Sequence, residues 1–521
     1  MSDPARRPLA GSAVTRRSLL LGGAAAVGAS AFGSALTLPG AGAAPLTDPF
    51  TLGVASGDPL PDGVVLWTRL APNPTADDGT GGAPRKAVPV QWEIAEDPNF
   101  RDVVQRGRTQ AAPESGHSVH VEVRGLRPGA EYFYRFKTGS EVSPAGRTRT
   151  APAPGSMEAL TMCFCSCANY GPGYFTAYRR MAEDHPDLML HLGDYMYEVG
   201  PKPGDVRHVL GAETKTLADY RRKYAQYKTD ADLQAAHATA PWLVVFDDHE
   251  VANNWADETP QKPDPNFPER RAAAFQAYYE NMPLRRSSLP RDGRMQLFRR
   301  YQWGALANFH MLDTRQYRDD QACGDGTKVV GCTERFDPGR SLTGEAQEQW
   351  LVDGLARSGA RWDVLGQQVF FSKIDLLAGP AEGHNTDSWD GYVANRDRIA
   401  TAMGSTARNP VVLTGDVHEH WAAEIKRTHD DPESRPVGTE FVTTSISSDG
   451  DGHPGADEAA LRENPHVKFN ASRRGYVRTR FGRDQLRVDY RTLDHVSRPG
   501  AEATTAKTFV VEDRNPRLHP A

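Results

Sequence analysis

The sequence has few features of a membrane, fibrous or nucleic-acid-binding protein. Outside residues 1–43, no stretch approaches the ~18 consecutive apolar residues that a membrane span needs, and there is no internal repeat or coiled-coil pattern. Among 521 residues, 61 Lys and Arg stand against 67 Asp and Glu. Because no basic excess draws the chain to a phosphate backbone, we expect no stable nucleic acid complex. The Gly-x-Ser-x-Gly pattern of serine hydrolases is also missing.

What is present is typical of a large globular protein. Hydrophobic residues make up 39% and charged residues 25% of the chain, which is enough for a sizeable core. A length of 521 residues exceeds what one hydrophobic core usually organises. We therefore expect more than one domain.

Residues 1–43 have the features of an export signal. Arginine pairs at 6–7 and 16–17 precede an apolar run from 19 to about 38, and the triplet Ala-Gly-Ala follows at 41–43. This order predicts a removed signal of the twin-arginine type, with the Tat translocase as partner during export. A membrane anchor is the alternative, but the run is rich in Gly, Ala and Ser. The mature chain is then acidic, without a transmembrane anchor, and secreted or associated with the cell wall.

The spacing of apolar residues changes along the rest of the chain. From 48 to 150, short alternating runs separated by Gly, Pro and Asp predict an all-β sandwich like a fibronectin type III domain. A Pro- and Gly-rich linker follows at 151–156. From 157 to 515, apolar strands alternate with helices, which predicts an α/β fold of layered central sheets flanked by helices. The expected elements include a helical region at 223–236 and a strand at 362–371.

Possible metal ligands follow four of the expected strands. A single Asp after a strand is usually a turn former or a helix cap. Ionised side chains that converge from several strands would instead repel one another unless cations neutralised them. The residues in these positions are Cys167, Asp194, Tyr197, the run Asp247-Asp248-His249-Glu250, Asp416 and His418.

The motifs resemble those of a known family. Gly-Asp-x-x-Tyr at 193–197, Asp-His-Glu at 248–250 and Gly-Asp-x-His at 415–418 are similar to the pattern of calcineurin-like metallophosphoesterases. Together with Phe-Cys-Ser-Cys at 164–167 and the segment 277–285, they resemble the alkaline phosphatase D family of PhoD-like phosphatases and phosphodiesterases. The resemblance covers nearly the whole chain after the signal. It implies a layered metallophosphoesterase sandwich preceded by the all-β domain.

The resemblance also implies two kinds of bound metal. Thiolate and phenolate are anionic donors suited to a trivalent ion, whereas carboxylate oxygens suit calcium. The implied ligands are Cys167, Asp194, Tyr197 and His418 for Fe³⁺, and Asp194 as a bridge, Asp248 and Asp416 for Ca²⁺.

Three further residues are candidates for the chemistry. We expect His249 to orient or protonate a leaving oxygen, although it could be only a hydrogen-bond donor behind the ligands. Arg315 stands where the family has a phosphate-contacting arginine, and its alternative is a surface salt bridge. Asn254 is a candidate for contact with metal or phosphate.

Five cysteines leave one thiol without a partner. Cys323 and Cys332 flank a short polar loop, where a local disulfide is the preferred interpretation. Cys163 and Cys165 are expected to be small buried residues, and Cys167 is the thiol assigned to iron.

The predicted function is that of a secreted, metal-dependent alkaline phosphatase and phosphodiesterase. Hydrolysis of phosphate mono- and diesters by a metal-activated oxygen nucleophile, for phosphate scavenging, is what the family implies. The substrates would be small phosphoesters, with phospholipid or teichoic acid as further possibilities. A phospholipase D-type phosphodiesterase of the same family is one alternative. A non-catalytic protein that binds the cell surface is the alternative from another class.

Overall fold

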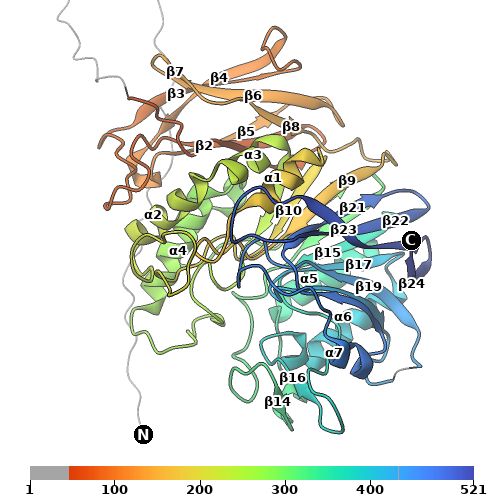
Figure 1. Cartoon of the computed structure of the whole chain (residues 1–521). Helices are drawn as coiled ribbons and strands as arrows, with labels where there is room; N and C mark the ends of the chain where they lie inside the picture. Colours follow the sequence, from red (N-terminus) through yellow and green to blue (C-terminus); the bar gives the residue numbers. More distant parts are fainter. Residues whose placement is uncertain (1–45, 432) are drawn as a thin grey trace, which may run out of the picture. The chain divides into compact units, whose positions relative to one another are not determined.

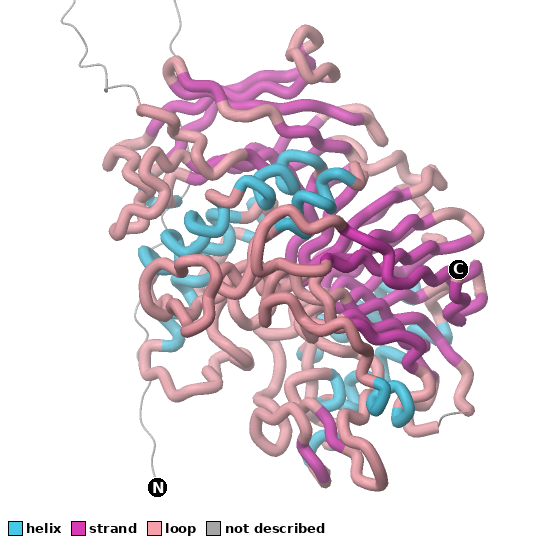
Figure 2. The backbone as a smooth tube through the Cα atoms, in the orientation of Figure 1, coloured by secondary structure: helices cyan, strands magenta, loops and turns pink. Residues whose placement is uncertain are grey.

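The computed structural model describes residues 46–431 and 433–521. Within these residues, a pair of large β-sheets face each other across one core (Figures 1 and 2). Leu192 of the first sheet and Met311 and Leu413 of the second belong to this core. Helices cover the outer faces, so the predicted layered α/β fold is confirmed. The predicted signal at 1–43 lies outside the described residues.

The first sheet is mixed, with its parallel strands in the middle. Strands β9, β10, β11 and β1 run parallel, and antiparallel strands extend the sheet on both sides. In spatial order the strands are β24 (Asn515–Pro520), β23 (Ala503–Glu512), β22 (Gln485–Leu493), β21 (Gly475–Phe481), β9 (Leu160–Cys165), β10 (Leu188–Leu192), β11 (Pro241–Val245), β1 (Val54–Leu60), β2 (Gly63–Arg69) and β5 (Ser118–Arg124).

The second sheet is also mixed, with its parallel strands in the middle. Its strands β13, β15, β17 and β19 are parallel, and antiparallel strands again form both edges. In order they are β12 (Arg299–Trp303), β13 (Ala307–Met311), β15 (Trp362–Gln367), β17 (Pro410–Thr414), β19 (Pro436–Val442), β18 (His420–Lys426) and β20 (Val467–Ala471).

The helices pack on the two sheets. Tyr178 of α1 and His237 of α3 contact Trp242 of β11 on the first sheet, and Leu351 of α5 and Ile399 of α6 belong to a core with the second sheet. None of the helices among the described residues is long and apolar enough to cross a membrane. The helices are α1 (Thr176–Glu183), α2 (Leu217–Lys228), α3 (Ala231–Thr239), α4 (Phe267–Asn281), α5 (Gly344–Arg357), α6 (Val393–Ser405) and α7 (Glu458–Glu463).

Two predicted elements were wrong in extent. The helical region at 223–236 is divided between α2 and α3, because the Asp230 side chain accepts hydrogen bonds from the amides of Asp232 and Leu233 and so caps a new helix. The strand expected at 362–371 ends at Gln367.

An all-β sandwich precedes the α/β domain, as predicted. A five-stranded sheet packs on β1, β2 and β5 through a core that includes Leu66, Ile94 and Tyr134. Since β1 also pairs in parallel with β11, one sheet of this sandwich continues into the first large sheet. The domain boundaries near 151–156 stay a prediction. The five strands are β3 (Val88–Ala95), β4 (Val103–Ala111), β6 (Glu131–Thr138), β7 (Glu141–Val142) and β8 (Gly146–Arg149).

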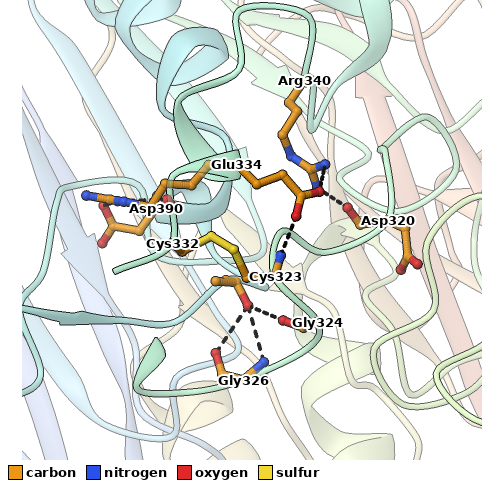
Figure 3. Close-up of a disulfide and its surroundings, with 10 residues drawn as sticks. Asp320, Cys323, Gly324, Gly326, Cys332, Glu334, Arg340 and Asp390 are labelled. Carbon is orange, nitrogen blue, oxygen red and sulfur yellow. Dashed lines mark hydrogen bonds and ion pairs between the residues drawn. A yellow bond between two sulfur atoms is a disulfide. The ribbon is translucent and has the colours of Figure 1, made fainter. Parts of the chain in front are cut away.

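Cys323 and Cys332 form a disulfide that closes a loop, which we call the disulfide loop (residues 323–332; Figure 3). Glu334 accepts a hydrogen bond from the Cys323 amide at 2.8 Å. The disulfide loop also pairs with a distant segment, because β14 (Val329–Val330) and β16 (Gly383–His384) form a two-stranded sheet. Cys163 and Cys165 are free and buried, as expected.

The disulfide should add measurable stability. A cross-link over nine residues restricts the unfolded chain, so the double variant Cys323→Ser/Cys332→Ser should lose about 2–3 kcal/mol of unfolding free energy. Urea denaturation measures this, and reduced wild-type protein serves as the matched control because it should behave like the variant. A wild-type midpoint that does not respond to reductant would contradict the disulfide.

Candidate metal centre

The predicted ligands come together at the carboxyl ends of strands from both sheets. The ends of β9, β10 and β11 lie next to one another because these strands are parallel neighbours. Gly193 lets the ends of β10 and β11 approach each other closely. Its φ is 105°, and a Cβ at this position would lie 2.4 Å from the Asp247 Cβ. The second sheet contributes the residues after β17. The strand ends carry Cys167, Asp194, Tyr197, Asp247, Asp248, Asp416 and His418.

Four of these residues adopt a backbone conformation that non-glycine residues rarely use. The φ angles are 61° at Cys167, 55° at Asp194, and 60° at both Asp416 and His418. Each such residue costs on the order of 1 kcal/mol, and such conformations concentrate at functional sites. These four residues therefore adopt backbone conformations that the site requires and that their own conformational preferences disfavour.

The four residues assigned to iron form one cluster. Donor atoms of Cys167, Asp194 and His418 lie within 4.8 Å of one another. The Tyr197 hydroxyl donates a hydrogen bond to Asp194 Oδ2 at 2.9 Å and lies 3.0 Å from His418 Nε2. Asp449 Oδ2 lies 2.6 Å from the other ring nitrogen of His418, which fixes the ring orientation.

A second cluster of carboxylates adjoins the first. Oxygens of Asp247, Asp248 and Asp416 lie within 4.8 Å of one another, and Asp194 and His249 form a similar group with Asp248. Among the residues that the structure describes, Asp247 Oδ2 and Asp248 Oδ1 are buried without a hydrogen-bond partner. Carboxylate oxygens buried in this way need positive charge close by to be stable as anions.

The electrostatics support the same conclusion. Burial, and then the charge of neighbouring anions, raises the pKa of Cys167, Asp194, Tyr197 and Asp416 well above their usual values. Burial also raises the pKa of Asp247 to about 7. The protein alone does not stabilise these groups as anions. Thiol, phenol, imidazole and carboxylate donors in this arrangement fit bound cations.

His249 is held at the edge of this centre. Its Nδ1 lies 2.7 Å from Glu198 Oε2, and its backbone amide donates to Asp194 Oδ1 at 3.2 Å. Burial opposes a charge on the ring, but Glu198, Asp248 and Asp194 outweigh burial and raise the pKa of His249. A buried carboxylate thus sets the orientation of the imidazole.

Arg315 differs from both expectations. Its side chain is 0% exposed, so the surface salt bridge is wrong. Nε donates to Asp247 Oδ1 at 2.6 Å, and Nη1 and Nη2 donate to the two oxygens of Asp387 at 2.9 and 2.8 Å. Because carboxylates occupy all three nitrogens, the guanidinium has no free fork for two phosphate oxygens.

Asn254 reaches the centre with its backbone. Its amide donates to Asp248 Oδ2 at 2.7 Å, whereas its side-chain Nδ2 donates to both oxygens of Asp325 at 2.8 Å. Asp325 belongs to the disulfide loop. The structure therefore does not bring the Asn254 side-chain nitrogen to the ligand clusters.

The sequence placed Glu250 among the possible ligands, but neither its role nor the site residues Glu198 and Asp387 were predicted. Glu250 accepts hydrogen bonds from the backbone amides of Asp194, Tyr195 and Asp247 at 2.7–3.0 Å, which joins the ends of β10 and β11. Glu198 directly follows the Gly-Asp-x-x-Tyr motif, so its position carried a signal. Asp387 lies in a loop without a motif, and its buried partners Arg315 and Arg318 reveal its role.

The sequence matches two family models. Residues 162–490 match the PhoD-like phosphatase model, and residues 35–152 match the model of the PhoD-like phosphatase N-terminal domain. The first of these spans more than half of the chain.

Individual proteins agree with the family models. Alkaline phosphatase D of Bacillus subtilis (strain 168) is 51% identical over 478 residues, which cover 89% of this chain and 81% of that protein. A solved structure described as the structure of PhoD superposes with a TM-score of 0.88 at 50% identity, covering 91% of this chain and 92% of the other. Purple acid phosphatase PPD1 from yellow lupin (Lupinus luteus) seeds shares the fold, with a TM-score of 0.53 at 14% identity, over 88% of this chain and 73% of the other. The chain belongs to the PhoD-like phosphatase family.

Proposed function

We propose that this chain is a secreted, metal-dependent alkaline phosphatase and phosphodiesterase that hydrolyses phosphate mono- and diesters for phosphate scavenging. Membership of the family makes it a phosphoric ester hydrolase. The observation that carries the metal dependence is the group of buried acidic donors at the strand ends, which Arg315 and His249 compensate only in part. A non-catalytic surface-binding role would not explain why these acidic groups are buried together at an energetic cost.

We further propose which residues hold which ion. Cys167, Asp194, Tyr197 and His418 would hold Fe³⁺, because they combine thiol, phenol, carboxylate and imidazole donors. Asp194, Asp248 and Asp416 would hold Ca²⁺, with Asp247 as a further oxygen donor. When bound, such cations neutralise charge on the phosphoryl oxygens and lower the pKa of water.

The remaining residues would position the reacting groups. His249 lies beside Asp194 and Asp248, and its Glu198 contact leaves the other ring nitrogen to hold a proton for the leaving oxygen. Arg315 would act as a positioning residue that connects Asp247, a member of the carboxylate cluster, to Asp387. The backbone of Asn254 would hold Asp248 in the same way.

Export is a separate element of the proposal. The paired arginines and the apolar run within residues 1–43 support transport by the Tat translocase to the outside of the cell. This pathway carries folded proteins, which suits a chain that must acquire its metals before export.

The ligand assignment predicts a selective loss of activity and metal. Cys167→Ala and Asp194→Ala should each lower kcat/KM for bis-p-nitrophenyl phosphate by at least about 100-fold, and elemental analysis should find less iron. Cys165→Ala is the matched control, because Cys165 is equally buried but belongs to no ligand group. Full diesterase activity in both ligand variants would show that the site is elsewhere.

The same assay separates the alternatives. Rates for bis-p-nitrophenyl phosphate, p-nitrophenyl phosphate and phosphatidylcholine should favour the two small esters. A strong preference for phosphatidylcholine would instead support the phospholipase D-type alternative. A protein with no stoichiometric metal and no hydrolysis would support the non-catalytic surface protein.

The effects of substituting Arg315 and Asp387 on the unfolding free energy should not be additive. Arg315→Gln and Asp387→Asn each break a buried ion pair and should each cost about 3 kcal/mol of unfolding free energy. The double variant should cost less than the sum, because the Arg315–Asp387 contact is lost only once, while Asp247 and Arg318 each lose one partner. Arg357→Gln, which breaks an exposed pair with Asp353, is the control and should cost less than about 1 kcal/mol.

Kinetics distinguish positioning from substrate contact in these variants. A positioning role predicts similar changes of KM and kcat in Arg315→Gln and Asp387→Asn. A large rise of KM in Arg315→Gln alone, with an unchanged unfolding midpoint, would mean that Arg315 binds the phosphoryl group directly.

A further inference from the structure

A cavity of ≈ 320 Å³ opens beside the candidate metal centre. Its lining includes Asn254, Asp387 and Asp416, which belong to the site described above. Thr327, Asn385 and Ser388 add further polar lining, and the remaining lining side chains, which we call the apolar wall, are apolar. The apolar wall consists of Phe370, Ile374, Leu376, Val417 and Trp421.

The apolar wall is a preformed surface. Phe370, Ile374 and Trp421 are each only 3% exposed and belong to one hydrophobic cluster, on which Leu376 and Val417 pack. The rings of Phe370 and Trp421 meet edge to face with centroids 5.9 Å apart. Packing of this kind holds the cavity open without any rearrangement.

The apolar wall starts next to the proposed metal ligands. Val417 is the variable residue of the Gly-Asp-x-His motif and lies between Asp416 and His418 in the chain. A substituent bound against Val417 would therefore lie close to a phosphoryl group at the candidate metal centre.

The rim of the cavity is fixed by the disulfide loop. Thr327 of that loop lines the cavity, and Asp325 holds Asn254, which also lines it. The Thr386 hydroxyl donates to the Gly324 carbonyl at 2.9 Å, which ties the loop to the segment that carries Asp387. The cavity is thus bordered by segments that hydrogen-bond to one another.

We propose that this cavity binds an apolar alkyl or aryl substituent of the phosphoester while the phosphoryl group lies at the metal centre. The inference rests on the proposed function and names the substrate class of that site. Against Phe370, Ile374 and Leu376, a charged or strongly hydrated substituent would lose water without gaining a partner, whereas an apolar one gains from burial. Polar side chains, among them Asn385 and Ser388, line the rest of the cavity.

Alkylphosphonates test this binding without turnover, because their C–P bond is not a phosphoester. Calorimetry with the full-length, metal-loaded protein should give a Kd that falls about fourfold per added methylene from methyl- to butylphosphonate. Inorganic phosphate is the reference ligand.

A pair of matched variants locates the alkyl group. Leu376→Trp fills the cavity and should reduce the ratio of the methyl- to the butylphosphonate Kd at least about tenfold. Leu461→Trp is the control, because Leu461 packs on the same cluster but does not line the cavity. It should keep the wild-type ratio. Thermal unfolding checks that both variants fold.

The outcomes separate the two proposals. A wild-type Kd that does not change with chain length, in a protein that hydrolyses p-nitrophenyl phosphate, overturns the inference and leaves the proposed function intact. A chain-length effect that is equal in both variants also overturns it, because the alkyl group then lies elsewhere. A protein that neither binds phosphate nor hydrolyses the ester overturns both proposals.

Discussion

Burial of several acidic side chains in one place is the constraint around which this site is built. Asp194, Asp247, Asp248 and Asp416 lie at the ends of strands from two sheets, and their oxygens lie within a few ångströms of one another. In a poorly hydrated interior, such a group is strongly unfavourable unless positive charge is close. The fold holds the carboxylates in place through parallel strand ends and left-handed backbone conformations, and the proposed cations would make the arrangement stable.

The protein supplies some of the compensation itself. Arg315 lies against Asp247 and Asp387, and these contacts lock two loops from distant segments of the chain. Glu198 fixes the ring of His249, and the disulfide loop fixes Asn254 through Asp325. Each contact positions a residue next to the candidate metal centre. Accurate placement of the ligands therefore depends on a surrounding layer of charged pairs.

The sequence predicted the layers of the fold and the residues that meet at the strand ends, because both follow from local patterns. Alternating apolar runs identified strands, and the carboxyl ends of parallel strands must lie side by side. It did not predict the role of Arg315, since the motif around that residue says nothing of Asp387, which lies 72 residues further along the chain. The pairing of β1 with β11 was missed for the same reason, because it depends on a distant contact that spacing does not encode.

The central claim is that the buried donors hold iron and calcium. X-ray diffraction from crystals of the exported protein, with data collected on both sides of the iron absorption edge, tests it directly. We predict an anomalous peak bounded by Cys167, Asp194, Tyr197 and His418, and a second, non-iron cation between Asp194, Asp248 and Asp416. Only water molecules at these two positions, in crystals of active enzyme, would contradict the account.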